Sequence, residues 1–369
     1  MTYTTVILFA TIIVPFVAPF KYKKKAMLIS WGLLFFIWAF QYQMSIDWFV
    51  YINRWNGAIR GVSLEDREIE PLYKLILMSF KPLSFFGYLM ACALFGIVVL
   101  KKYVDSYIAT NRQWIFFLTF SIGVSYFLEF VDTNRQTLAI MFVMIAVYIE
   151  SNGYLKTLKI KYWVIALMMI IAAFNIHRSA IITLPMLLFP IFIIKNINYR
   201  YLYIFIAIDV FSFFVDFSHL SLFIEMSMAN ETSLDGFNHY VADINERSKS
   251  FIEQGIFLLS LLLLIFHFDK FKNNEKPIIL CAIIYLAFQG YAMYTMLRAL
   301  SYYRIFFALA IPLLYMKFST KNKKMRYIAN GLLAFYITYM IYRYSIDING
   351  SNVEGFKNFK TIFDAPVWQ

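Results

Sequence analysis

Cysteine and histidine are scarce in this chain, and their scarcity excludes several kinds of site. The 369 residues include two cysteines and four histidines. Cys92 and Cys281 both lie in apolar runs, which argues against a disulfide framework and against a thiolate metal site. None of the histidines is spaced with carboxylates as metal ligands are. We therefore expect no bound metal and no cofactor.

Charged residues are also few, and no glycine-rich phosphate loop is present. The charged fraction is 15%, whereas hydrophobic residues make up 61% and aromatic residues 20% of the chain. The missing phosphate loop argues against an ATP-driven machine. A soluble domain would carry a much larger share of charge. This composition predicts an all-α, polytopic integral membrane protein.

About twelve apolar runs are long enough to cross the roughly 30 Å of bilayer hydrocarbon as helices. We expect them to form a single transmembrane domain over residues 1–369. The runs at 162–176 and 179–194 are short, and the second contains Pro185 and Pro190, so a tilted or re-entrant pair is an alternative there. The expected spans are 3–20, 26–44, 83–100, 113–130, 135–150, 162–176, 179–194, 201–217, 251–268, 277–297, 302–318 and 327–345.

The distribution of lysine and arginine predicts the orientation in the membrane. Short basic loops such as 21–25 and 317–326 alternate with connections that hold most of the acids. The basic face should be cytoplasmic, which places both termini outside. The net charge of +12 then reflects this asymmetry, and we expect no nucleic-acid partner. The two larger loops, 45–82 and 218–250, both fall on the outer face and indicate that the working surface is there.

Arg135 begins an apolar run directly after a predicted outer turn. Asp132, Thr133 or Asn134 can cap the incoming helix. Arg135 would then face the positive end of the helix dipole, which is unfavourable by about 0.3–1 kcal/mol. A bound anion would reverse this penalty, because guanidinium and free helix N–H groups can share one phosphate. The alternative is an ion pair of Arg135 with Glu129 or Asp132 that only fixes the helices.

His177 and Arg178 lie at another predicted outer turn. A histidine titrates near neutral pH and can act as acid, base or hydrogen-bond donor. The arginine offers a second guanidinium, whose paired N–H groups can bind an anion. The alternatives are a structural histidine and an arginine that extends along the membrane surface. Ser179 follows them as a helix cap.

Arg298 and Arg304 are expected to bracket a third outer turn, 297–304. Arg304 would lie within the next span, where a charge is costly unless it faces a cavity, so we favour it over Arg298 as a functional residue. Tyr302 and Tyr303 could stack on sugar rings, although an aromatic belt at the membrane interface explains them equally well.

Two carboxylates of the first outer loop are candidate general bases. Asp47 directly follows a predicted span, and Glu70 precedes a helical stretch. A carboxylate near the membrane surface could accept the proton of a sugar hydroxyl. The alternative for both is a solvated loop charge.

Five short motifs between about residues 40 and 310 form a set with these candidates. Together they resemble the pattern of EpsG-type membrane proteins, which belong with the Wzy-like bacterial polysaccharide polymerases. The motifs are Asp47-Trp with Tyr51, Glu70-Pro-Leu-Tyr73, Asn134-Arg135-Gln136 with Leu138-Ala139, His177-Arg178-Ser179, and Tyr303-Arg304.

The resemblance implies a glycosyltransferase at the outer face of the bacterial cytoplasmic membrane. It would join oligosaccharide repeats carried on undecaprenyl diphosphate and release the lipid diphosphate. Arg135 and Arg304 would grip the diphosphate with help from Arg178. The base would be Asp47, Glu70 or His177. Further substrate contacts are expected from Asn134, Gln136, Arg298 and Tyr303. The expected partners are this lipid-linked oligosaccharide, the bilayer, a flippase and chain-length regulator proteins.

Other functions fit parts of the same pattern. A flippase or anion exporter would have a similar number of spans, but transporters usually carry midplane ionisable residues, and here Asp209 is the clear case. A membrane O-acyltransferase would use His177 as its base and would need an inner entrance for the acyl donor. An O-antigen ligase would use the same donor and differ only in its acceptor.

Overall fold

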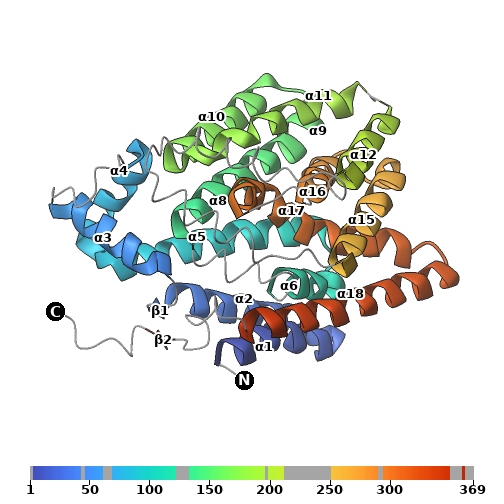
Figure 1. Ribbon diagram of the computed structural model, residues 1–369, viewed down its shortest axis with the longest axis horizontal. Coiled ribbons are helices and arrows are strands. Elements are labelled where there is room, and N and C mark those ends of the chain that lie inside the picture. Colours follow the sequence, from blue (N-terminus) through green and yellow to red (C-terminus); the bar gives the residue numbers. More distant parts are fainter. Residues whose placement is uncertain are drawn as a thin grey trace. The chain divides into compact units, whose positions relative to one another are not determined.

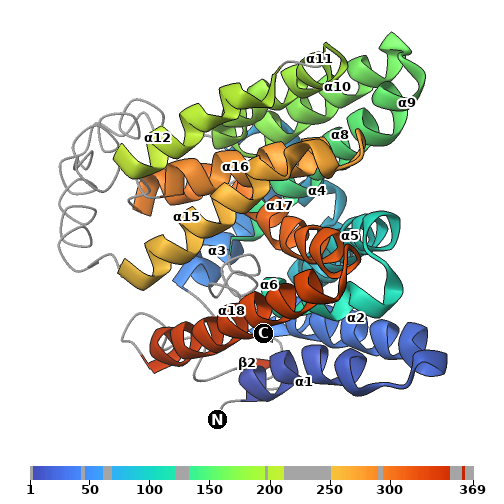
Figure 2. The same cartoon turned by 90° about the vertical axis from the view of Figure 1, so that its right-hand side faces the viewer.

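The computed structural model describes residues 3–42, 46–60, 69–121, 133–195, 198–211, 251–289, 294–349 and 360–361, and within them the chain is almost entirely helical (Figures 1 and 2). The α-helices are α1 (Tyr3–Val17), α2 (Lys23–Ala39), α3 (Ile46–Arg60), α4 (Pro71–Ser79), α5 (Ser84–Tyr107), α6 (Gln113–Ser121), α8 (Asn134–Ile149), α9 (Leu155–Thr157), α10 (Ile160–Ile176), α11 (Phe189–Ile194), α12 (Tyr203–Phe211), α15 (Phe251–Phe266), α16 (Lys276–Gln289), α17 (Tyr294–Ser319) and α18 (Lys323–Asn349). Shorter 3-10 segments are η1 (Phe20–Tyr22), η2 (Lys81–Leu83), η3 (Thr110–Arg112), η6 (Arg178–Leu188), η7 (Tyr199–Leu202) and η8 (Phe268–Lys270), and η5 (Glu150–Tyr154) is a π-helix.

Each of the twelve predicted apolar runs contains helix, which confirms the helical fold class. A two-residue antiparallel pair, β1 (Gln41–Tyr42) with β2 (Lys360–Thr361), is the exception to the all-helical prediction among the described residues. By length and apolar composition, two described helical stretches could cross a membrane, Lys81–Tyr107 and Asn134–Thr157, and five further apolar helices are shorter. Twelve spans therefore remain a prediction. The predicted outer loop 218–250 lies outside the described residues, whereas 45–82 contains α3 and α4.

The contacts divide the chain into two compact units. The first consists of 1–142, 175–177 and 311–369, and the second of 143–174 and 178–310. Each unit therefore includes part of α8 and part of α17.

In the first unit, α1 and α2 form a helical hairpin joined by η1, and the two helices lie side by side in both views (Figures 1 and 2). Polar side chains fasten this hairpin inside an otherwise apolar core. The Ser30 hydroxyl donates to the Thr11 carbonyl at 2.8 Å, and the Thr11 hydroxyl lies 3.2 Å from that of Ser121 on α6. Such bonds satisfy hydroxyl groups that burial removes from water.

The packing of α2 on α5 requires a glycine. A Cβ atom at Gly96 would lie 2.1 Å from the ring of Trp38, so only the bare backbone lets this indole lie against α5. The indole Nε1 of Trp38 then donates to the Asn134 side-chain oxygen at 3.4 Å. The α2–α5 contact thereby reaches the first residue of α8.

In the second unit, α12, α15 and α16 pack against one another, and α11 contacts both η6 and α16. A small apolar cluster of Ala146, Ala166, Ile170 and Leu187 lies between α8, α10 and η6. The Trp163 indole donates to the Leu187 carbonyl at 3.0 Å. Pro185 lies in the 3-10 segment η6 and Pro190 in the short α11. Whether this pair is tilted or re-entrant in a membrane stays a prediction.

Glu150 occupies an unusual place at the end of α8. It lies in the π-helix η5 with 1% of its surface exposed. Among the residues that the structure describes, neither carboxylate oxygen of Glu150 has a hydrogen-bond partner, and the same is true of the Ser151 hydroxyl. Gly153 in the same π-helix lies against the Tyr162 ring, 2.6 Å from where a Cβ would be. A carboxyl group buried without partners should destabilise the fold.

We expect the substitution Glu150→Met to stabilise the protein. Methionine has a similar volume and no hydrogen-bonding group to desolvate. Mutational data put the free-energy cost of an unsatisfied buried polar group at about 1–3 kcal/mol. The thermal unfolding midpoint in detergent should rise. Glu253→Met on α15 is the control, since Glu253 is partly exposed and its replacement should not raise the midpoint. An unchanged or lower midpoint for Glu150→Met would contradict this reading of the π-helix.

Candidate functional site

The clearest cluster of charged side chains lies in the first unit, where α3, α4 and the first turn of α8 contribute to one site. Arg135 donates from Nη1 to Oε2 of Glu70 at 2.6 Å. The two residues are 65 positions apart in the sequence, and their side chains are 19% and 8% exposed. This pair is a short, charge-assisted hydrogen bond that is largely screened from water.

Local helix signals place both members of the pair. Glu70 precedes Pro71, which starts α4 as proline commonly starts helices, and the Glu70 carbonyl accepts from the Lys74 N–H at 2.9 Å. Its side chain does not cap α4 and extends instead to Arg135. Thr133 precedes α8, and its carbonyl accepts from the Thr137 N–H at 2.8 Å.

The Glu129 or Asp132 partner expected for Arg135 lies outside the described residues, and the partner that the structure shows is Glu70. Asn134 and Gln136, on either side of Arg135, are both buried. Asn134 accepts the hydrogen bond from Trp38 described above. Arg135 is therefore held from two directions, by its ion-pair partner and by the packing of its neighbours.

Aromatic side chains form one wall of the site. The Arg135 guanidinium carbon lies 5.9 Å from the centre of the Tyr73 ring, within the range of a cation–π interaction. The Tyr88 hydroxyl donates to that of Tyr73 at 3.5 Å, and Trp55 from α3 stacks on Tyr88 with ring centres 6.0 Å apart. Burial raises the pKa of Tyr73 to about 12, against the opposing effect of nearby positive charge from Arg135 and Arg54. Tyr73 therefore stays a neutral phenol at physiological pH.

One guanidinium donor of Arg135 is unused. Its Nε atom is buried and has no hydrogen-bond partner among the described residues. Tyr51 from α3 also lies close enough to Arg135 to interact with it electrostatically. A buried cationic donor without a partner is a cost to the fold. A ligand can reach only the exposed part of the Arg135 side chain, which is 19% exposed.

The other candidates of the first unit are described only in part. Asp47 lies in α3, one helical turn before Tyr51, and its side chain is outside the description. His177 lies between α10 and η6 and is half-buried. By its contacts His177 belongs to the same unit as Arg135, while Arg178 belongs to the other. These positions do not identify either Asp47 or His177 as the general base.

The second unit holds the remaining predicted residues. Arg178 is exposed at the start of η6, and Arg304 is buried within α17. The turn predicted at 297–304 is wrong, because α17 begins at Tyr294 and includes both Arg298 and Arg304. The segment Leu-Arg-Ala-Leu has high helix propensity and no glycine or proline to end a helix. The side chain of Arg298 lies outside the description.

Tyr303 has a structural contact that the sequence did not suggest. Its hydroxyl donates to the Ile182 carbonyl in η6 at 2.7 Å. In a 3-10 helix that carbonyl would accept from the residue three positions later, which is Pro185 and has no N–H. Tyr303 thus satisfies the carbonyl that the proline leaves open. Beside it, the Tyr302 hydroxyl lies 3.2 Å from that of Ser179.

We expect Tyr303→Phe to destabilise the protein by about 1–3 kcal/mol, the cost of leaving a buried carbonyl without a partner. The change removes one oxygen and keeps the ring, so the packing of α17 should be preserved. Thermal unfolding in detergent would measure the effect. Tyr327→Phe, at an exposed position of α18, is the matched control. Equal midpoints for the two variants would show that the Ile182 contact contributes nothing.

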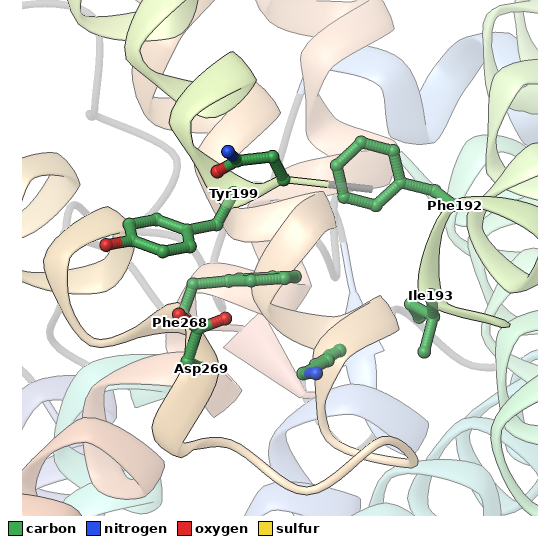
Figure 3. Close-up of a pocket in the computed structure, with 7 residues that line it drawn as sticks. Phe192, Ile193, Tyr199, Phe268 and Asp269 are labelled. Atoms are coloured by element: carbon green, nitrogen blue, oxygen red, sulfur yellow. The ribbon is translucent and has the colours of Figure 1, made fainter. Parts of the chain in front are cut away.

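A cavity of about 200 Å³ lies elsewhere in the second unit, between α11, η7, η8 and the start of α16. Figure 3 shows the rings of Phe192, Tyr199 and Phe268 around it, with Asp269 beside Phe268. Lys276 also lines it, and its ammonium lies 5.5 Å from the centre of the Phe268 ring. None of the predicted site residues lines this cavity.

Metal ligands do not gather in the described part of the chain, where no group of three or more His, Cys, Asp and Glu side chains lies together. The chemistry that the first unit offers is instead that of guanidinium, carboxylate and phenol. Sequence reasoning found Arg135 and Glu70 separately and named Asp47 and Tyr51 of α3, but it did not predict that α3 packs at the site through Trp55. Its signal was available: Tyr51 and Trp55 are four residues apart, as buried positions on one helix face are.

Comparison of the chain with curated proteins and with solved structures gave no match. Comparison with protein families matched residues 24–354 to the EpsG family. This match includes every residue of the Arg135 cluster and nearly the whole chain. Members of the family are membrane proteins, and membership suggests a role in polysaccharide biosynthesis. The chain therefore belongs to the EpsG family.

Proposed function

We propose that the protein is a polysaccharide polymerase that joins lipid-diphosphate-linked oligosaccharide repeats at the outer face of the bacterial cytoplasmic membrane. The observation that carries the proposal is the Arg135–Glu70 pair beside Tyr73, which fixes a partly exposed guanidinium in a largely buried site. Family membership supports the substrate class, since polysaccharide biosynthesis requires an activated sugar donor.

In the proposed reaction, a hydroxyl oxygen of the incoming repeat attacks the anomeric carbon of the growing chain. The bond from that carbon to the phosphate oxygen breaks, and the diphosphate leaves with the bonding electrons. Negative charge therefore grows on the leaving group in the transition state. A guanidinium already fixed in place stabilises this charge without reorganisation. Arg135 supplies it, and the energy of the reaction comes from the diphosphate ester itself.

Glu70 has a positioning role in this scheme. Its carboxylate is engaged with Nη1 of Arg135, which fixes the plane of the guanidinium and directs the remaining donors toward the ligand. The proton of the acceptor hydroxyl then goes to another base. Asp47 and His177 are the two candidates that remain for this step, the first from α3 and the second from the end of α10.

The proposal is tested with purified protein in lipid nanodiscs and a synthetic undecaprenyl-diphosphate-linked repeat. We expect a ladder of products, each longer by one repeat, without nucleotide and in the presence of a metal chelator. Reconstitution into vesicles with labelled lipid provides the second readout. Movement of the labelled lipid between leaflets without a ladder would favour a flippase and overturn the polymerase proposal. Transfer of a single chain to another acceptor, without a ladder, would favour a ligase.

A further inference from the structure

The cavity of about 200 Å³ in the second unit lies where several apolar helices begin and end. Its lining residues come from the last turn of α11, from the start of η7, from η8 and from the first residue of α16. Directly before η8, α15 ends at Phe266, and directly after η7, α12 begins at Tyr203. In the predicted topology the connections 195–200 and 269–276 both lie at the inner face of the membrane. The cavity is therefore expected at the inner membrane surface.

Two side chains of opposite charge line this cavity without pairing with each other. They are Asp269 and Lys276, and the structure, which describes both side chains, shows no ion pair between them. The other acid of this connection is Glu275, which is buried and accepts a hydrogen bond from the Lys272 N–H at 2.8 Å. Asp269 is exposed and Lys276 is half-buried. A ligand can therefore reach a negative and a positive group in the same cavity.

Lys276 lies at the positive end of a helix dipole. It is the first residue of α16, which has 14 residues, and Pro277 follows it. A cation is unfavourable at this end of a helix, whereas an anion is favoured. The contact of the ammonium with the Phe268 ring at 5.5 Å offsets part of this cost. A phosphate beside Lys276 would interact favourably with both the ammonium and the helix dipole.

Asp269 and three aromatic rings favour a cation. Figure 3 shows Tyr199 and Asp269 on one side of Phe268 and Phe192 on the other in this view. The rings of Phe192 and Phe268 are in edge contact, with centres 6.5 Å apart. Aromatic rings attract ammonium groups, and a carboxylate beside them accepts the N–H bonds of the same group. This side of the cavity therefore suits an ammonium.

The size of the cavity and the surface beside it favour the headgroup of a lipid. Pockets for drug-sized ligands have about 300–1,000 Å³, so this cavity admits a smaller group. A row of aromatic rings leads away from it, with ring centres 6.3 Å apart for Tyr199 and Tyr203 and 5.9 Å apart for Tyr203 and Phe266. Tyr203 and Phe266 are 38% and 55% exposed. The polar cavity thus continues into an exposed apolar surface, which acyl chains can cover.

We propose that this cavity binds the headgroup of a phosphatidylethanolamine from the inner leaflet, with its phosphate at Lys276 and its ammonium at Asp269 and Tyr199. In this headgroup a short ethyl ester joins the phosphate to the ammonium, so one small molecule carries both charges. A phosphatidylglycerol headgroup has the phosphate but no ammonium, and it would use only Lys276. The site shares no residue with the Arg135 cluster, and its binding of lipid does not depend on the polymerase reaction.

The test measures lipid binding to the purified full-length protein in dodecyl maltoside by native mass spectrometry. Phosphatidylethanolamine and phosphatidylglycerol with identical acyl chains are compared. Wild-type protein should bind phosphatidylethanolamine about three- to tenfold more tightly, through one exposed ion pair and one cation–π contact. Asp269→Asn should remove this preference by weakening phosphatidylethanolamine binding alone, and Tyr199→Leu should reduce it. Lys276→Gln should weaken binding of both lipids.

Lys270→Gln is the matched control, because Lys270 is exposed and adjacent to Asp269 but does not line the cavity. It makes the same change of charge as Lys276→Gln and should leave both affinities near their wild-type values. Equal effects of these two variants would show that only the overall surface charge attracts lipid, and would overturn the proposal. Size-exclusion profiles establish folding. A wild-type preference in Asp269→Asn and Tyr199→Leu, or in whichever of them is folded, would overturn it as well.

A competition with water-soluble glycerophosphoethanolamine separates a lipid site from a site for a free metabolite. This molecule has the same headgroup but no acyl chains to cover Tyr203 and Phe266. At the concentration of the lipid it should not displace bound phosphatidylethanolamine from wild-type protein. Displacement at that concentration would make the headgroup alone the ligand and would overturn the assignment to a membrane lipid.

Discussion

Arg135→Ala is expected to lower the rate of ladder formation roughly 100- to 1,000-fold, as removal of one fixed donor to a developing oxyanion does. The substitution removes the cation that would meet the leaving diphosphate. It also removes the ion pair with Glu70 at 2.6 Å, so folding has to be checked in the same preparation. The rate is measured from single-turnover formation of the first elongated product, which separates chemistry from product release.

Arg135→Lys distinguishes charge from geometry in the same assay. Lysine keeps the positive charge but cannot form the forked contact, so an intermediate rate is expected. Arg200→Ala should retain the wild-type rate, since Arg200 is an exposed residue of η7 and is not among the candidate site residues. A fully active, correctly folded Arg135→Ala variant would exclude Arg135 from the reaction and would remove the main support for the proposed site.

The positions of the helices could be predicted from sequence because the signal is local. Most of the apolar runs are long and have few charges, and a backbone in lipid can satisfy its own hydrogen bonds only as a helix or a closed barrel. The ends were predicted less well. The run at 83–100 continues to Tyr107 in α5, and the expected turn at 297–304 is helix. Side-chain charge marks where a segment leaves the membrane, but it does not end a helix.

The candidate site could be predicted only in part because its partners are distant in the sequence. Arg135 stood out as a cation at the start of an apolar run, and the partners proposed for it were the nearest acids, Glu129 and Asp132. Glu70 is the partner that the structure shows, and nothing in either local sequence joins the two. The loop predicted at 45–82 includes no packed helix before Glu70. In the structure α3 lies there, with Tyr51 and Trp55 buried.

Glu70→Ala is expected to destabilise the protein toward the lower end of the about 3–5 kcal/mol seen when one partner of a buried ion pair is removed. The lower end applies because the Arg135 side chain keeps 19% exposure, so water still reaches part of the guanidinium. The double variant Glu70→Leu with Arg135→Met should be more stable than Glu70→Ala, since it leaves no charge uncompensated. Denaturant unfolding in detergent of wild type, Glu70→Leu, Arg135→Met and the double variant measures the coupling between the two side chains, and additive effects would show that the pair does not couple.

The same position separates a positioning carboxylate from a general base. Glu70→Gln keeps an oxygen that can accept from Nη1 of Arg135 but cannot take a proton at neutral pH. If Glu70 holds Arg135, as its 2.6 Å contact suggests, Glu70→Gln should retain much more activity than Glu70→Ala, with an unchanged pH profile. Equal and near-complete loss in both variants would make Glu70 the base instead. Glu70, the one described carboxylate partner of Arg135, would then leave the ion pair in each turnover to take the proton of the substrate. The ligand would have to hold the Arg135 guanidinium in place instead.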